Sequence, residues 1–181
     1  MKPALIVIDM IKGNEPFFTE EHRKIVPKIS ETIEACRKNS IPIIFANDSY
    51  MKNDWLFEFM KEHAVRGTDG VEVIDELRPE KEDIIVEKRR FSAFFRTDLD
   101  LTLRELGVDT VALAGINTNV CVLATAFDAI SSNFYTILLS DCCASSRKEL
   151  HDFIVKKFRG LPAFTVMESE EFIRTISRNR R

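Results

Sequence analysis

Apolar residues occur along this chain in short uninterrupted runs that alternate with stretches of helical spacing. Six runs have the length of buried strands, at residues 3–10, 41–48, 83–88, 111–114, 134–139 and 163–167. An apolar run without polar alternation is typical of a strand covered on both faces. Amphipathic spacing predicts helices at about 27–38, 98–106, 120–130, 147–158 and 169–176.

The regular alternation of buried strands with helices predicts an α/β fold. We expect a three-layer α/β/α arrangement of Rossmann-like topology, with one six-stranded parallel sheet covered by helices on both faces. The chain has 181 residues and contains no internal repeat or linker. A single domain over residues 1–181 is therefore expected.

The connection from Ser49 to Pro79 is the one long stretch without a clear period. Trp55 to Met60 fits either a short helix or a packed loop, and Gly67 and Gly70 indicate turns. A connection of this length is often functional, as a lid or as a wall of a pocket. Alternatively, it contains elements that the pattern does not reveal, and both interpretations stay open.

Composition excludes several classes of function. The net charge of −3 predicts no nucleic-acid partner, and the basic run from Arg178 to Arg181 is expected to be a solvated tail. No apolar stretch approaches the length needed to span a membrane, and no secretory signal is expected. The four cysteines lack the spacing of a disulfide framework, so we expect reduced thiols and a cytoplasmic protein.

One of these cysteines, Cys121, lies at a position where its thiol could be activated as a nucleophile. The buried run after Asp109 ends at Gly115, Asn119 is placed to cap a helix, and Cys121 is then expected in the first turn of that helix. Free backbone N–H groups and the helix dipole at such a position favour thiolate over thiol. The alternative is an inert buried cysteine, which is common for free thiols.

Two further residues whose side chains could take part in catalysis end predicted strands, namely Asp9 and Lys88. Because ligands bind outside the carboxyl ends of parallel strands, we expect these residues and Cys121 to gather at one edge of the sheet. Alternatively, Asp9 forms a turn and Lys88 is a surface charge. No histidine ends a strand, although a Cys–His dyad using His63 stays open. Metal-ligand spacing and a glycine-rich phosphate loop are both absent, so Asp9 is the best candidate base.

Five segments, in this order, resemble the isochorismatase-like cysteine hydrolases, a family that includes nicotinamidases and N-carbamoylsarcosine amidases. They are ALIVIDM around Asp9, HAVRGTDGVEVIDEL from His63 to Leu77, VEKRRFSAFFRTDLD from Val86 to Asp100, VALAGINTNVCVLATAFDA from Val111 to Ala129, and LLSDCCAS from Leu138 to Ser145. The resemblance implies the family fold over most of the chain.

The resemblance also implies a catalytic triad of Asp9, Lys88 and Cys121. Asp9 would act as base and then as acid, Lys88 would stabilise the charges, and Cys121 would attack a carbonyl carbon to form a thioester. It further implies a cis peptide bond between Ile116 and Asn117. The backbone N–H groups of Asn117 and Cys121 would then form an oxyanion hole.

Departures from the family's subgroups narrow the expected substrate. Nicotinamidases carry an Asp-x-His metal element after the second strand, where this chain has Asp48-Ser49-Tyr50 with no histidine before His63. The resemblance therefore implies no metal and no other cofactor. Isochorismatases proper cleave a vinyl ether and lack the cysteine nucleophile, so Cys121 counts against that activity.

What remains is hydrolysis of a small amide or N-carbamoyl compound, similar to the reaction of N-carbamoylsarcosine amidase. A nicotinamidase-type amidase is the alternative within the family. The alternative of another class is a non-catalytic small-molecule-binding or thiol-redox protein on the same fold. The resemblance implies a homo-oligomer, either a dimer or a tetramer.

Overall fold

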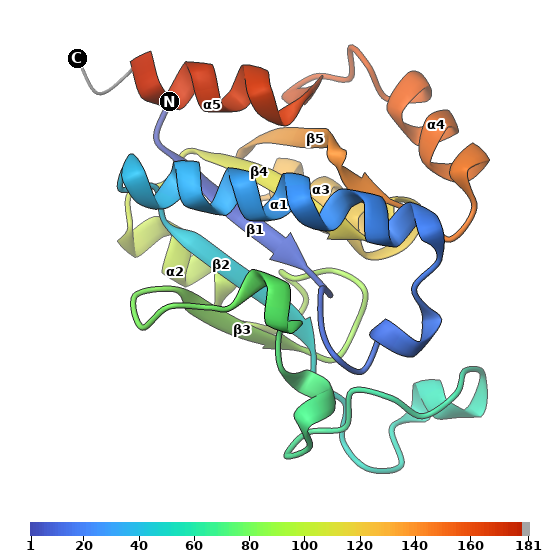
Figure 1. The fold of residues 1–181 in the computed structure, drawn as a ribbon. Coiled ribbons are helices and arrows are strands. Elements are labelled where there is room, and N and C mark those ends of the chain that lie inside the picture. The colour runs from blue at the N-terminus through green and yellow to red at the C-terminus, as the bar shows by residue number, and fades with distance from the viewer. Residues whose placement is uncertain (179–181) are drawn as a thin grey trace.

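The structure is a computed structural model that describes residues 1–178, so most of the expected basic tail, residues 179–181, lies outside the described residues. Its centre is one six-stranded, all-parallel sheet in the order β3-β2-β1-β4-β5-β6 (Figure 1). This confirms the predicted α/β fold. The strands are β1 (Pro3–Ile8), β2 (Ile43–Asp48), β3 (Ile84–Lys88), β4 (Thr110–Ile116), β5 (Tyr135–Ala144) and β6 (Phe164–Met167).

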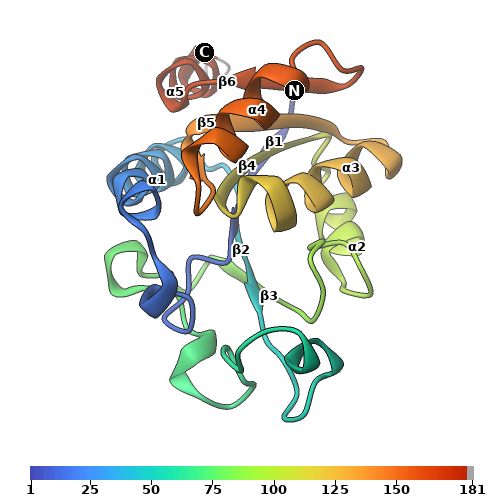
Figure 2. The same cartoon turned by 90° about the vertical axis from the view of Figure 1, so that its right-hand side faces the viewer.

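Helices cover both faces of the sheet, which gives the three predicted layers (Figure 2). They are α1 (Glu20–Lys38), α2 (Leu99–Glu105), α3 (Leu123–Ser131), α4 (Lys148–Lys157) and α5 (Ser169–Arg178). One apolar core lies between the sheet and the pair α1 and α5. A second core lies on the opposite face, where α2 and α3 pack and α4 contributes partly buried residues. Alternate residues of each buried strand enter the two cores, as the lack of polar alternation predicts.

The sheet topology brings four strand ends together. β1 is central and pairs with β2 on one side and with β4 on the other. β3 adds to the outer side of β2, with Asp48 in register with Lys88. Because all strands are parallel, the residues that end or follow β1, β2, β3 and β4 share one edge of the sheet.

Helix α1 begins seven residues earlier than the pattern indicates, at Glu20, and Pro27 lies inside it. Proline in a helix removes one backbone hydrogen bond, which is why the sequence predicted a start near Pro27. The helix nevertheless continues because its apolar face, including Ile25 and Ile29, is buried against the sheet. Its start is fixed instead at Thr19 by the ring of His22.

The segment that carries Cys121 also differs from expectation. Residues Thr118–Val122 form a π-helical turn that precedes α3, and Asn117, rather than Asn119, stands at its start without capping it through its side chain. Cys121 therefore does not lie in the first turn of a regular α-helix. The period of apolar residues cannot distinguish a wider turn of this kind from the first turn of α3.

The connection after β2 contains three short 3-10 turns, at Trp55–Glu58, Asp69–Val71 and Asp75–Leu77. The first two turns contribute to a small separate core formed by Ile11, Tyr50, Leu56 and Ala64, whereas Leu77 of the third turn is buried in the core that contains α1. The connection is thus packed irregular structure, and it supplies part of the wall of the cavity described below.

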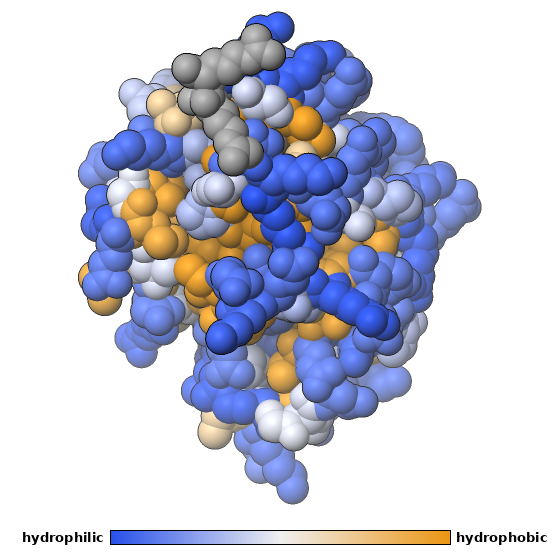
Figure 3. All heavy atoms as spheres, turned by 60° about the vertical axis from the view of Figure 1, so that its left-hand side comes forward, coloured by the Kyte–Doolittle hydropathy of each residue, from blue (hydrophilic) through white to orange (hydrophobic). Residues whose placement is uncertain are grey.

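The surface carries several exposed large apolar side chains, among them Trp55, Phe59 and Phe153, each more than half exposed. On the face drawn in Figure 3, hydrophilic side chains surround smaller hydrophobic patches. Within residues 1–178, none of the helices combines the length and the apolarity that crossing a bilayer demands.

Candidate active site

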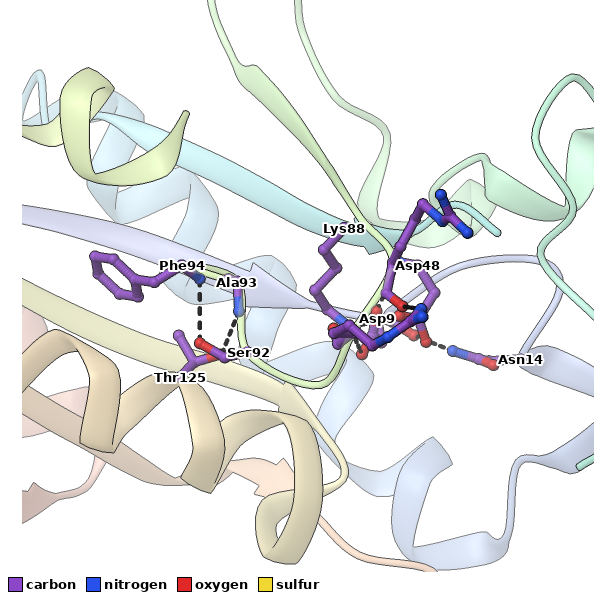
Figure 4. Close-up of polar contacts among 10 residues, drawn as sticks. Asp9, Asn14, Asp48, Lys88, Ser92, Ala93, Phe94 and Thr125 are labelled. Carbon is purple, nitrogen blue, oxygen red and sulfur yellow. Dashed lines mark hydrogen bonds and ion pairs between the residues drawn. The ribbon is translucent and has the colours of Figure 1, made fainter. Parts of the chain in front are cut away.

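The structure brings Asp9, Lys88 and Cys121 together at the carboxyl edge of the sheet, and adds Asp48 to them. Asp9 follows β1 directly and has a φ of +56°, in the left-handed region. Its backbone is held there by a bond from its N–H to the carbonyl of Ala46 (3.1 Å) and by the Asn14 amide, which donates to the Asp9 carbonyl (3.0 Å; Figure 4). This backbone conformation is uncommon outside glycine, and such residues concentrate at functional sites.

Lys88, the last residue of β3, is fully buried and lies between two carboxylates. Its Nζ is 2.9 Å from Oδ2 of Asp9 and 2.5 Å from Oδ1 of Asp48 (Figure 4). The third ammonium hydrogen is donated to the carbonyl of Arg90, at 3.2 Å. All three donors of the ammonium are therefore occupied inside the protein.

Asp48 is the residue of this cluster to which sequence reasoning assigned no role in the reaction. Its backbone N–H donates to Oδ1 of Asp9 (2.8 Å), while its carboxylate accepts from Lys88. The sequence offered one signal, since Asp48 ends a buried strand as Asp9 and Lys88 do. That signal was interpreted as a remnant of a nicotinamidase metal element.

The charges of this cluster do not balance, because two buried carboxylates face one ammonium. Burial and the charge of Asp48 raise the pKa of Asp9 to about 7, although Lys88 opposes this rise. Burial alone would lower the pKa of Lys88, but Asp48 and Asp9 outweigh it and hold that pKa well above its ordinary value. Near neutral pH, Lys88 is therefore charged and Asp9 is close to its titration midpoint.

The sulfur of Cys121, a carboxylate oxygen of Asp9 and a carboxylate oxygen of Asp48 lie within 4.8 Å of one another. Burial, together with the negative charges of Asp9 and Asp48, raises the pKa of Cys121 well above its ordinary value, and Lys88 only partly opposes this. The expected thiolate is therefore wrong for the resting site, where Cys121 is a thiol. The reason is that the carboxylates and burial outweigh the few free N–H groups of a five-residue turn.

The cluster does not fit a metal ion, although one ligand atom each from Asp9, Asp48 and Cys121 lies within 4.8 Å of the others. The Lys88 ammonium already stands between the two carboxylates, where a cation would bind. The nicotinamidase-type set fits no better, since Tyr50 takes the place of its histidine and the Ser49 hydroxyl donates to Glu87.

The remaining predicted positions lie beside Cys121. The peptide bond between Ile116 and Asn117 is cis. The carbonyl of Asn117 accepts from the N–H groups of Val120 and Val122 and so fixes the turn around Cys121. The loop after Lys88 is tied to the same helix, because the N–H of Ala93 donates to the hydroxyl of Thr125, four residues beyond Cys121 (Figure 4).

A cavity of about 280 Å³ opens onto this cluster. Aromatic side chains form much of its wall, and among the described residues that line it there is no lysine or arginine. His63 is in this wall, with Nδ1 2.8 Å from the carbonyl of Lys61, and is not part of the cluster around Cys121. The lining residues are Asp9, Asn14, Phe17, Phe18, His22, Asp48, Tyr50, Met60, His63, Phe91, Ile116, Asn117, Val120, Cys121 and Ser146.

Comparison with known proteins assigns the family. The isochorismatase domain family matches residues 3–171. An isochorismatase-like hydrolase from Alkaliphilus metalliredigens is 36% identical, covers 97% of this chain and 99% of its own, and superposes with a TM-score of 0.91. N-carbamoylsarcosine amidase from Thermoplasma acidophilum is 36% identical, with coverage of 94% and 98% and a TM-score of 0.85.

Nicotinamidase 3 of Arabidopsis thaliana is 31% identical in an alignment of 155 positions that covers 82% of this chain and 76% of the plant protein. The fold, the domain match and these relatives agree with one another. This chain belongs to the isochorismatase-like hydrolase family.

Proposed function

We propose that this protein is a cysteine-dependent hydrolase that cleaves the C–N bond of a small amide or N-carbamoyl compound. The observation that carries the proposal is the cluster next to a cavity, in which the Cys121 thiol lies beside the Asp9 carboxylate and Asp9 pairs with the buried Lys88. A thiol, a carboxylate with a pKa of about 7 and a fixed ammonium are the groups that nucleophilic catalysis at neutral pH requires.

In the first half-reaction, Asp9 takes the proton of the Cys121 thiol as the sulfur attacks the carbonyl carbon of the substrate. The resting thiol needs this transfer during attack, because its own pKa is raised. The tetrahedral intermediate carries an oxyanion, which the N–H groups of Asn117 and Cys121 stabilise. Asp9 then gives the proton to the leaving nitrogen, and the C–N bond breaks to leave a thioester on Cys121.

In the second half-reaction, water enters in place of the released amine. Asp9, again a carboxylate, takes a proton from this water as its oxygen attacks the thioester carbon. Collapse of the second tetrahedral intermediate releases the acid or carbamate, and the proton returns to Cys121. Lys88 stays charged throughout and stabilises Asp9 and the departing thiolate.

The proposal extends the family assignment to a substrate class. N-carbamoyl compounds are the first class, by likeness to the Thermoplasma N-carbamoylsarcosine amidase. A second candidate is a nicotinamidase-type amidase acting on an uncharged ring. It is favoured by the aromatic wall formed by Phe17, Phe18, Tyr50 and Phe91, and by the lack of a lysine or arginine among the described lining residues.

The test is a screen for ammonia release from neutral aromatic amides and from anionic N-carbamoyl amino acids, run with the wild type and with Cys121→Ala. We expect the wild type to release ammonia and the variant to lose at least about a thousandfold in kcat, because the thioester cannot form. Mass spectrometry should detect an acyl adduct on Cys121.

Cys36→Ala is the matched control, since Cys36 is a buried thiol of α1 in a different core. It should keep its activity. Full activity in Cys121→Ala would overturn the proposal, and a wild type inactive on both substrate classes would favour a non-catalytic binding or thiol-redox protein.

A further inference from the structure

His22 contacts the candidate oxyanion loop from a distant part of the chain. The sequence did not mark this residue as a candidate, because no histidine ends a predicted strand. In the structure it is 3% exposed, near the start of α1, and lines the cavity above Cys121. Its two ring nitrogens both have partners, which are the backbone N–H of Thr19 (3.2 Å) and the side-chain oxygen of Asn117 (3.0 Å).

The hydrogens in this network can be assigned from the chemistry of the partners. The Thr19 N–H can only donate, so Nδ1 of His22 accepts. A neutral imidazole then carries its proton on Nε2, which donates to Oδ1 of Asn117. Burial lowers the pKa of His22 and so favours this neutral form. The backbone N–H of Ser146 also donates to the same atom (3.0 Å), which identifies it as the oxygen of the Asn117 amide.

The oxygen of the Asn117 side chain is thus held from two sides, by α1 through His22 and by the segment after β5 through Ser146. Rotation of this side chain would break both bonds. The backbone of Asn117 is the part of the loop whose N–H is directed, in the proposed mechanism, at the developing oxyanion. A donor stabilises a transition state only if it is held in place before the reaction, and a displacement of about 1 Å can cost about a hundredfold in rate.

We propose that His22 is a positioning residue of this active site, which holds Asn117 so that its N–H meets the oxyanion. The inference rests on the proposed function, because it assigns His22 to a step of that reaction. His22 does not touch the reacting atoms and takes no proton from the substrate.

Two substitutions of His22 distinguish the effect of its two hydrogen bonds from the effect of the imidazole ring itself. His22→Gln keeps both, since the amide oxygen can accept from the Thr19 N–H, as in an ordinary capping box, and the amide nitrogen can donate to Asn117. His22→Leu removes both. Thr19→Ala is the control for damage to the start of α1, because it alters the same helix end and leaves the backbone N–H of Thr19 in place.

Three readouts are measured on the intact protein. Hydrolysis of the best amide from the screen gives kcat and KM. In the reversible addition of benzaldehyde, Asp9 takes the thiol proton, the S–C bond forms and the C=O π bond breaks to leave an oxyanion, so this reaction reports on the loop without turnover. In the alkylation of Cys121 by iodoacetamide, Asp9 takes the thiol proton and an S–C bond forms as iodide leaves, without an oxyanion, so this reaction reports on Cys121 and Asp9 alone.

We expect His22→Leu to lower kcat and benzaldehyde affinity about tenfold to a hundredfold, with KM and the alkylation rate nearly unchanged. His22→Gln and Thr19→Ala should stay close to the wild type. The inference is overturned if His22→Leu matches an active wild type, if His22→Gln is as impaired as His22→Leu, or if alkylation falls in parallel with kcat. If the wild-type protein neither hydrolyses an amide nor binds benzaldehyde, that result would instead contradict the proposed function and therefore also this inference.

Discussion

At the scale of single residues, the site is governed by a surplus of negative charge. One carboxylate would balance Lys88, yet the structure buries two, Asp9 and Asp48, against it. Burial first, and the charge of Asp48 second, raise the pKa of Asp9 to about 7, so that a proton is retained near neutral pH. A base whose pKa lies near the working pH can both take and return a proton in one cycle. In the proposed reaction, Asp48 would act through Asp9, without contact with the substrate being required.

Asp48→Asn tests this assignment. The substitution removes the charge that raises the pKa of Asp9 and leaves Lys88 to favour the ionised carboxylate, so that pKa should fall. In the wild type, kcat/KM should rise with pH through about 7 as Asp9 becomes ionised. In the variant this acid limb should move to lower pH, and the plateau should be lower because Asp9 is then a weaker base.

A pH–rate profile of both proteins measures the effect. Asp141→Asn is a suitable control, because Asp141 is a carboxylate that binds Ser169 at the start of α5, away from the cluster. Its profile should overlay that of the wild type. An unshifted acid limb in Asp48→Asn would show that Asp48 has no influence on Asp9.

At the scale of elements, the sequence pattern predicted the strands, whose positions depend on repeated burial. It missed the start of α1, which depends on a single contact. All six strands overlap the apolar runs that predict them, because a strand buried on both faces needs such a run, although β5 continues past its run to Ala144. The first seven residues of α1 were missed, since Pro27 suggested a start and the contact of His22 with Thr19 is invisible without coordinates. Asp9 and Lys88 stand at strand ends and Cys121 follows β4, so the proposed triad could be named from the sequence. The contacts of His22 with Asn117 and of Asp48 with Asp9 join residues far apart in sequence, which no local pattern reveals.

Gly115 shows how closely two of these elements approach. Its φ is +113°, and a Cβ at this position would collide with the carbonyl oxygen of Ile8 and lie 2.7 Å from the Ile8 nitrogen. Ile8 precedes Asp9, and Gly115 precedes the Ile116–Asn117 bond. A side chain here would therefore push apart β1 and β4 at the point where both deliver site residues.

We expect Gly115→Ala to lower the free energy of unfolding by about 4 kcal/mol or more, or to prevent folding, because backbone atoms cannot move aside cheaply. Gly160→Ala is the matched control, since Gly160 has a φ of +84° with open space around it. It should cost only about 1–2 kcal/mol, the usual penalty for a left-handed alanine. Urea denaturation measures both, and equal losses would mean that the contact with Ile8 is unimportant.

At the scale of the whole molecule, the fold holds a strained and charged site inside a well-packed frame. Two apolar cores, one on each face of the sheet, bury most of the strand residues and supply the stability. The site lowers the free energy of unfolding that these cores provide, because burying an uncompensated carboxylate is unfavourable. The expected homo-oligomer stays a prediction, which sedimentation analysis would measure.

The cost of the site should be visible in the pH dependence of stability. The pKa of Asp9 is about 7 in the folded protein and near 3.8 in an unfolded chain. Between these values the folded state holds more protons than the unfolded state. The contribution of Asp9 to the free energy of unfolding therefore decreases as the pH rises from about 4 to about 7, and is constant outside that window.

Asp9→Asn lacks the titrating group and should lack this slope, so that its stability relative to the wild type improves steadily from pH 4 to pH 7, while its activity is lost. Asp54→Asn gives the contrast. Burial opposes ionisation of Asp54, but Arg89 and Arg90 hold its pKa below the ordinary value. Asp54 is thus ionised in both states from about pH 5 upward, and its loss should cost a similar amount at every pH from there to 7. Urea denaturation of the three proteins at several pH values decides the matter, and parallel curves for Asp9→Asn and the wild type would mean that Asp9 is not the buried, proton-holding carboxylate of this site.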